Sequence, residues 1–188
     1  MIVSWLSDEI ATAQHTLHVG EEAFHAVSPP DADHFVQAVK HQFLKYPERP
    51  SKFWWDQDLR EQACCAVQFN GPGLQQLAHV APSAGEVVLL ITNTEVAGEG
   101  EPIAVYEATV PAAQKILSEV HGHHEYYLAS KLLTWLLCET HHGQIIAMGT
   151  PVVDRLQGYV RQHPDLVREA YVLPAGSLER AWSRWVLP

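Results

Sequence analysis

The amino-acid sequence predicts an α+β fold, in which a central, largely antiparallel sheet is packed by N-terminal and C-terminal helices. Segments with helical periodicity open and close the chain, whereas β-branched and alternating segments fill its middle. Clusters of Gly, Pro and Asn separate these segments. Because strands follow one another instead of alternating with helices, this order favours an antiparallel sheet over βαβ units.

Two helices are expected in the N-terminal third of the chain. The first is expected over residues 7–24. Asp31 can cap the second helix, in which Phe35, Val39 and Phe43 recur at four-residue spacing. This spacing places the three side chains on one apolar face, which we expect to pack against the sheet.

The middle of the chain predicts strands. Residues 52–55 form a short aromatic run, and residues 87–91 form a β-branched run that is typical of a central strand buried on both faces. Residues 103–106 follow an acidic loop, and we expect them to pair with 87–91 as a hairpin. A helix is then expected over residues 111–120.

The following region predicts an antiparallel meander of three strands, over residues 125–131, 134–140 and 144–149. Thr150 is expected to cap the next helix, because Pro151 behind it suits the first helical position.

The C-terminal part predicts a short strand over residues 170–173 and a final helix over 177–185. The chain has 188 residues, of which 47% are hydrophobic. This is enough apolar content for one core and too little chain for two ordinary domains, so a single domain over 1–188 is expected.

Composition argues against several classes of protein. No apolar run approaches the roughly 20 residues that span a bilayer, and the N-terminus lacks the basic start of a signal peptide. The three cysteines show no disulfide spacing pattern, so we expect a cytoplasmic protein. The formal net charge of -10 disfavours nucleic-acid binding, because phosphate contacts need Lys and Arg.

Histidines are abundant and partly clustered, since five of the twelve lie between residues 121 and 142. If Leu132 and Leu133 form a two-residue turn, Lys131 faces Thr134, and the same register brings distant histidines together. The side chains expected to gather at the open end of this hairpin are His123, His124, Glu125, Glu139, His141 and His142.

Three interpretations of this cluster remain open. Imidazoles beside carboxylates are plausible ligands for a divalent transition metal such as zinc. They could also form a pH-sensitive or catalytic group, or they could simply be hydrated loop residues. Cys138 is close enough to be considered as a thiol nucleophile, but strand alternation points it into the protein. We therefore assign no catalytic residue.

A second set of residues fits a protein partner. Glu95, Glu99 and Glu101 make an acidic loop that could dock a basic protein. Trp54 and Trp55 are adjacent in an expected strand and so point to opposite faces; both can belong to the core, or one can be exposed and serve an interface. A partner protein or a homodimer could use this surface.

The segment 125–149 resembles a module of small, uncharacterised bacterial proteins. In that module a strand with a short basic turn leads into a Trp-bearing strand, a His-His pair and an apolar strand that ends in Gly. Those proteins are similar to immunity-type α+β domains, including the SUKH group. The resemblance implies a factor that blocks a toxin, and it implies no catalytic residues.

The sequence thus favours a non-enzymatic protein-binding domain, an immunity- or antitoxin-like factor that binds a basic, toxin-like partner through an acidic surface. The alternatives are a metal-binding protein or enzyme that uses the histidine cluster, and a homo-oligomeric structural protein.

Overall fold

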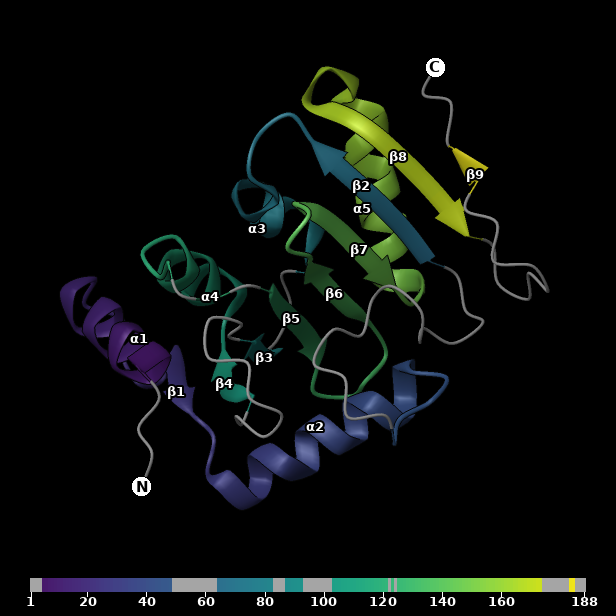
Figure 1. The fold of residues 1–188 in the computed structure, drawn as a ribbon. Helices are drawn as coiled ribbons and strands as arrows, with labels where there is room; N and C mark the ends of the chain where they lie inside the picture. Colours follow the sequence, from purple (N-terminus) through teal and green to yellow (C-terminus); the bar gives the residue numbers. More distant parts are fainter. Residues whose placement is uncertain are drawn as a thin grey trace.

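The structure, a computed structural model, describes residues 5–48, 64–82, 87–92, 103–121, 123, 125–173 and 183–184. Nine strands of these residues form one sheet in the order β1-β4-β3-β5-β6-β7-β2-β8-β9, and each described pairing is antiparallel (Figure 1). The predicted α+β class and the largely antiparallel sheet are confirmed.

The described strands are β1 (Phe24–Ala26), β2 (Cys64–Phe69), β3 (Val87–Thr92), β4 (Ala104–Ala108), β5 (Glu125–Ser130), β6 (Leu136–Glu139), β7 (Gln144–Met148), β8 (Val167–Leu173) and β9 (Ser183–Arg184). The described helices are α1 (Trp5–Thr16), α2 (Pro29–Phe43), α3 (Leu77–Val80), α4 (Val110–Leu117) and α5 (Thr150–Gln162), with 3-10 turns η1 (Gly73–Gln76) and η2 (Pro164–Leu166). No helix in these ranges is long and apolar enough to cross a membrane.

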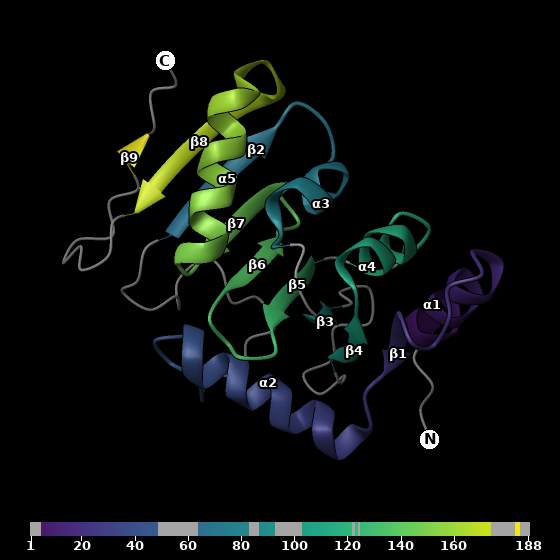
Figure 2. The same ribbon diagram turned by 180° about the vertical axis from the view of Figure 1, so that it is seen from behind.

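Helices cover both faces of the sheet. α1, α3, α4 and α5 lie on one face and α2 lies on the other, as the two opposite views show (Figures 1 and 2). The sheet has a hydrophobic core on each face, and alternate residues of β5 contribute to each core, because successive side chains of a strand point to opposite faces. Tyr126 and Leu128 pack on the face of α4, whereas Tyr127 and Ala129 pack with Val39 of α2.

The predicted meander and its register are both confirmed. Tyr126 lies opposite Glu139, as predicted from the register in which Lys131 faces Thr134. The turn itself is longer than predicted, because the last backbone bond of the hairpin joins Ser130 N to Trp135 O at 3.2 Å. Leu133 adopts a φ of 52°, and the loop gains one residue from each strand, so the register is unchanged.

Other predictions hold in the middle of the chain. β3 pairs with β4 as the expected hairpin and lies between β4 and β5, inside the sheet. The predicted helix over 111–120 is α4, which buries Ala113, Ile116 and Leu117. The aromatic segment 52–55 lies outside the described residues.

The first two helix boundaries differ from those predicted. The first helix ends at Thr16 instead of continuing to Phe24, because Phe24 pairs with Ala108 in the sheet. The second helix is preceded by Ser28 in the cap position, whereas Asp31 had been expected there. Asp31 lies in the first turn of the helix, where its carboxylate accepts a hydrogen bond from the Ser28 hydroxyl at 2.6 Å.

Two corrections concern the C-terminal part. Gly149, not Thr150, caps α5 with a φ of 89°, and a Cβ there would lie 2.3 Å from the Thr134 carbonyl oxygen. Residues 183–184 form β9 on the edge of β8, so a helix over 177–185 is wrong at these residues. A local sequence pattern does not reveal that β8 presents an edge to which a later segment can pair.

Candidate functional site

The predicted histidine cluster forms where β5 begins and β6 ends. The confirmed register brings the residues before Tyr126 beside those after Glu139. The pleat sends Glu125 and Glu139 to opposite faces, because Glu139 faces Tyr126, the neighbour of Glu125. The two carboxylates therefore belong to two separate networks at one end of the hairpin.

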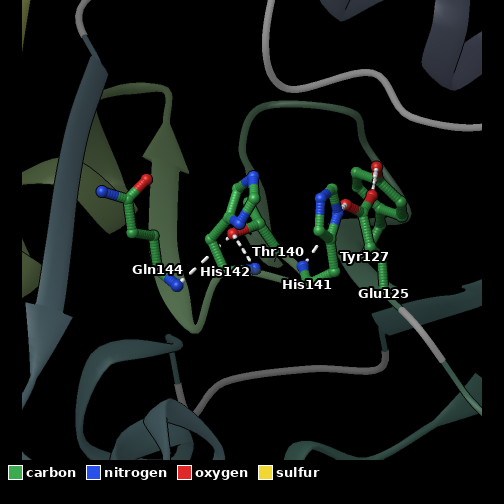
Figure 3. Close-up of polar contacts among 6 residues, drawn as sticks. All are labelled: Glu125, Tyr127, Thr140, His141, His142 and Gln144. Atoms are coloured by element: carbon green, nitrogen blue, oxygen red, sulfur yellow. Dashed lines mark hydrogen bonds and ion pairs between the residues drawn. The ribbon is translucent and has the colours of Figure 1, made fainter.

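Glu125 is the centre of the first network, in which its carboxylate contacts His141 and Tyr127 (Figure 3). Its side chain is 0% exposed. The Oε1 atom lies 2.7 Å from His141 Nδ1, and the Tyr127 hydroxyl donates to Oε2 at 2.5 Å. A buried carboxylate is tolerated only where such partners offset its loss of hydration. The pairing also fixes the orientation of the His141 ring.

A tight turn between β6 and β7 holds His141 and His142 in place. The Thr140 hydroxyl accepts from the backbone N–H groups of His142 and Gln144, at 3.2 and 3.4 Å (Figure 3). Gly143 closes the turn with a φ of 71°. The ring centroids of His142 and His141 lie 4.0 Å apart, and His142 is exposed.

Glu139 is the centre of the second network, on the face covered by α4. The Tyr126 hydroxyl donates to its Oε2 at 2.7 Å, and the Gly73 N–H donates to its Oε1 at 2.9 Å. A Cβ on Gly73 would lie 2.7 Å from Ile145 Cγ1, so only glycine lets η1 approach this closely. Burial raises the pKa of the Glu139 carboxyl, while hydrogen bonds from Tyr126 and the backbone of Gly73 and Leu74 oppose the rise.

A surface cavity of about 340 Å³ adjoins Glu139, and we call it the histidine-lined cavity. Its polar lining consists of Ser118, His121, His123, Tyr126, Glu139, Thr140 and His141. Pro72, Leu74, Leu117 and Val120 supply its apolar walls. Among the described residues that line it, Glu139 is the one carboxylate and there is no Lys or Arg.

The predicted metal ligands are only partly brought together. His123, His141 and Glu139 border one cavity, Glu125 contacts His141 from the other face, and His142 does not line the cavity. Within the described ranges, no three His, Cys, Asp or Glu side chains are arranged to hold a metal ion. His124 lies outside the described residues.

Cys138 is buried, as strand alternation predicted. Burial first, and then the nearby Glu125 charge, raise the pKa of its thiol well above the usual range. A nucleophilic cysteine needs the opposite shift, so the thiol of Cys138 behaves as part of the core. The same holds for Cys65, whose pKa burial raises to about 12 against the opposing influence of Arg161.

Sequence reasoning did not select several residues of the site. Tyr126 and Tyr127 could have been found, because the predicted register already placed Tyr126 beside Glu139. The contribution of Gly73 had no sequence signal, since η1 reaches the site from 66 residues away. The residues expected to bind a partner, Trp54, Trp55, Glu95, Glu99 and Glu101, lie outside the described residues.

Comparison with known proteins gives one finding. A family model described as a family of unknown function, DUF6756, matches residues 4–160. The matched span contains all residues of the histidine-lined cavity. No curated protein and no solved structure matches the chain.

Proposed function

We propose that this chain, which belongs to the DUF6756 family of unknown function, is a non-enzymatic binding protein that recognises a basic protein partner. The histidine-lined cavity would receive a cationic side chain of that partner, with Glu139 as its counter-charge. The observation that carries this proposal is the lining of the cavity, which combines one carboxylate with no Lys or Arg.

An arginine side chain suits this cavity for chemical reasons. A guanidinium group offers five N–H donors in a plane and no acceptor. Glu139 supplies a carboxylate acceptor, and the rings of His121, His123 and His141 lie in the same lining. Because Tyr126 and Gly73 already hold the carboxylate in position, little ordering remains to be done on binding.

The overall charge supports a basic partner. The formal net charge is -10, and residues 1–39 contain six acidic residues and no Lys or Arg. Part of this acidic segment adjoins the cavity, since Glu9 in α1 accepts the backbone N–H of His121 at 2.9 Å. Such a field would speed the encounter with a basic protein. An immunity- or antitoxin-like role toward a basic toxin would use the same surface.

Calorimetric titration with a small probe tests this proposal. N-acetyl-L-arginine amide carries the charge, and N-acetyl-L-citrulline amide has nearly the same shape without it. At pH 7.5 and low salt we expect the arginine probe to bind at least about tenfold more tightly, a difference of about 1.4 kcal/mol. Glu139→Gln should abolish this preference. Equal binding of both probes, or a preference that survives Glu139→Gln, would overturn the proposal.

A metal ion is the second candidate: His121, His123, His141 and Glu139 border the same cavity, although among the described residues no three of them are placed to hold an ion. Titration of tag-free protein with Zn²⁺ separates the two candidates. Saturable binding of one equivalent that both His123→Asn and Glu139→Gln weaken would favour the metal. Binding that neither substitution changes would remove this candidate.

A further inference from the structure

A second cavity, of about 510 Å³, adjoins the histidine-lined cavity, and we call it the α4 groove. Pro72, Leu74 and Ser118 line both, so one surface depression continues into the other. The remaining lining of the α4 groove comes from Gln75, Pro111, Gln114 and Lys115. A ligand anchored near Glu139 can therefore extend into this groove.

The lining residues that α4 contributes define the length of peptide that could lie along the α4 groove. Pro111, Gln114, Lys115 and Ser118 are spaced as i, i+3, i+4 and i+7, so they form one stripe along α4. At 1.5 Å per residue this stripe is about 10 Å long. An extended chain advances about 3.3 Å per residue, so about three residues would match the stripe.

The chemistry of the groove selects what these residues can be. Pro72, Leu74 and Pro111 offer apolar contacts to side chains. Gln75 and Gln114 carry amides that can bond to a peptide backbone, and the side-chain N–H of Gln114 donates to the backbone carbonyl oxygen of Gln75 at 3.4 Å. Lys115 brings the one positive charge of this lining, so it disfavours a second basic residue in the partner.

We propose that the α4 groove binds about three extended, apolar residues that flank the cationic residue of the partner. The recognised element is then one arginine or lysine next to a short apolar stretch, and not a polybasic run. This inference rests on the proposed function, because the cation in the histidine-lined cavity sets the starting point of the segment.

Peptide extension tests the inference. The probes are Ac-Arg-Leu-Ala-Leu-NH₂ and the reversed Ac-Leu-Ala-Leu-Arg-NH₂, compared with N-acetyl-L-arginine amide and with Ac-Arg-Lys-Ala-Lys-NH₂. We expect one of the two leucine peptides to bind at least about tenfold more tightly than the arginine probe. The lysine peptide should gain nothing. A lysine peptide that gains as much, or leucine peptides that gain nothing, would overturn the inference.

A matched pair of variants locates the effect. Gln75→Trp places a large side chain in the α4 groove, whereas Gln162→Trp makes the same change at an exposed residue outside that lining. Gln75→Trp should remove the gain from extension and leave binding of the arginine probe intact, and Gln162→Trp should change neither. A gain that survives Gln75→Trp contradicts the inference.

The two proposals fail in different ways in this experiment. If the groove is correct and the cation site is wrong, the leucine peptide with citrulline in place of arginine should still bind more tightly than N-acetyl-L-citrulline amide. Gln75→Trp should remove that difference. If the cation site is correct and the groove is wrong, the arginine probe still prefers wild type over Glu139→Gln, and extension adds nothing.

Discussion

Glu125 and Glu139 lie at the same end of one hairpin, yet their surroundings differ. Glu125 is 0% exposed on the face of α2, where His141 and Tyr127 contact its carboxylate. Glu139 lies on the opposite face, where its carboxylate borders a cavity. The pleat of two strands thus separates a carboxylate that fixes the local structure from one that can meet a ligand.

The two sides also differ in how the surrounding chain reaches them. Glu125 is held by the β6–β7 turn that immediately follows its partner strand. Glu139 is held in part by η1, which lies far away in the sequence. We therefore expect substitutions near Glu125 to change stability most, and substitutions near Glu139 to change binding most.

Glu125→Ala should have the largest effect. It leaves the buried Tyr127 hydroxyl and the His141 ring without the acceptor that they share. A buried donor left without its acceptor costs about 1–3 kcal/mol, and two donors lose theirs here, so the free energy of unfolding measured by urea denaturation should fall by more than any single hydrogen bond contributes. Glu48→Ala, at a side chain 84% exposed, should change it by less than about 0.5 kcal/mol. Similar values for the two variants would show that Glu125 is not a structural centre.

Gly73→Ala should have the second-largest effect, and it should change both the stability of the protein and its binding of ligand. The added Cβ would lie 2.7 Å from Ile145 Cγ1 and 2.9 Å from Glu139 Oε1, so η1 must move away. Such overpacking costs about 1–3 kcal/mol, and the moved η1 should weaken binding of N-acetyl-L-arginine amide.

Gly71→Ala is the matched control for Gly73→Ala, because its Cβ would meet only the flexible end of Gln75, at 3.8 Å. Denaturation and calorimetry on the two alanine variants check the expectation. If both variants behave alike, the close approach of η1 to Glu139 is unimportant.

The two tyrosines compare the networks directly. Tyr127→Phe removes a hydroxyl that donates on the sealed side, where water cannot replace it. A hydrogen bond to a charged group contributes about 1.5–3 kcal/mol, so the free energy of unfolding should fall by about this amount. Tyr126→Phe should cost less, because water in the cavity can reach Glu139. The reverse order of the two losses would contradict the division between a sealed and an open side.

Glu139→Gln should have the smallest effect, a change in how the free energy of unfolding depends on pH. Burial raises the pKa of Glu139 in the folded protein above its usual value of 4.5, so folding favours the protonated carboxyl. Its contribution to stability is complete below about pH 4.5 and is lost as the pH rises through the folded pKa. The groups that line the same cavity, His121, His123, His141 and Tyr126, are present in both wild type and Glu139→Gln, so the comparison cancels their direct titration.

Urea denaturation at a series of pH values gives this comparison. The stability of wild type relative to Glu139→Gln should increase as the pH falls from 7 toward 4.5. A constant difference, or one that decreases toward acid, would show that the folded protein does not raise the pKa of Glu139.

The hairpin region shows what sequence could establish. In a hairpin, the residues at equal distances from the centre of the turn lie opposite each other. The register of β5 with β6 was therefore predicted correctly, because the turn is longer than predicted by one residue on each side. The register also decided which of Glu125 and Glu139 would share a face with Tyr126. Local patterns were sufficient here because the contacts lie within one meander.

Sequence failed where a distant segment completes a contact. Neither the approach of Gly73 to Glu139 nor the α4 groove follows from periodicity, because each joins segments that lie far apart in the chain. The tail failed for a related reason, since an open sheet edge overrode the helical spacing at residues 183–184.

The pKa of Glu139 is the most direct test of cation binding. The NMR signal of its side-chain carboxyl carbon, recorded over a series of pH values, measures this pKa. A bound cation stabilises the ionised carboxylate, so saturating N-acetyl-L-arginine amide should lower this pKa, and N-acetyl-L-citrulline amide should not. An unchanged Glu139 pKa in protein that has bound the arginine probe would contradict the assignment of Glu139 as the counter-charge.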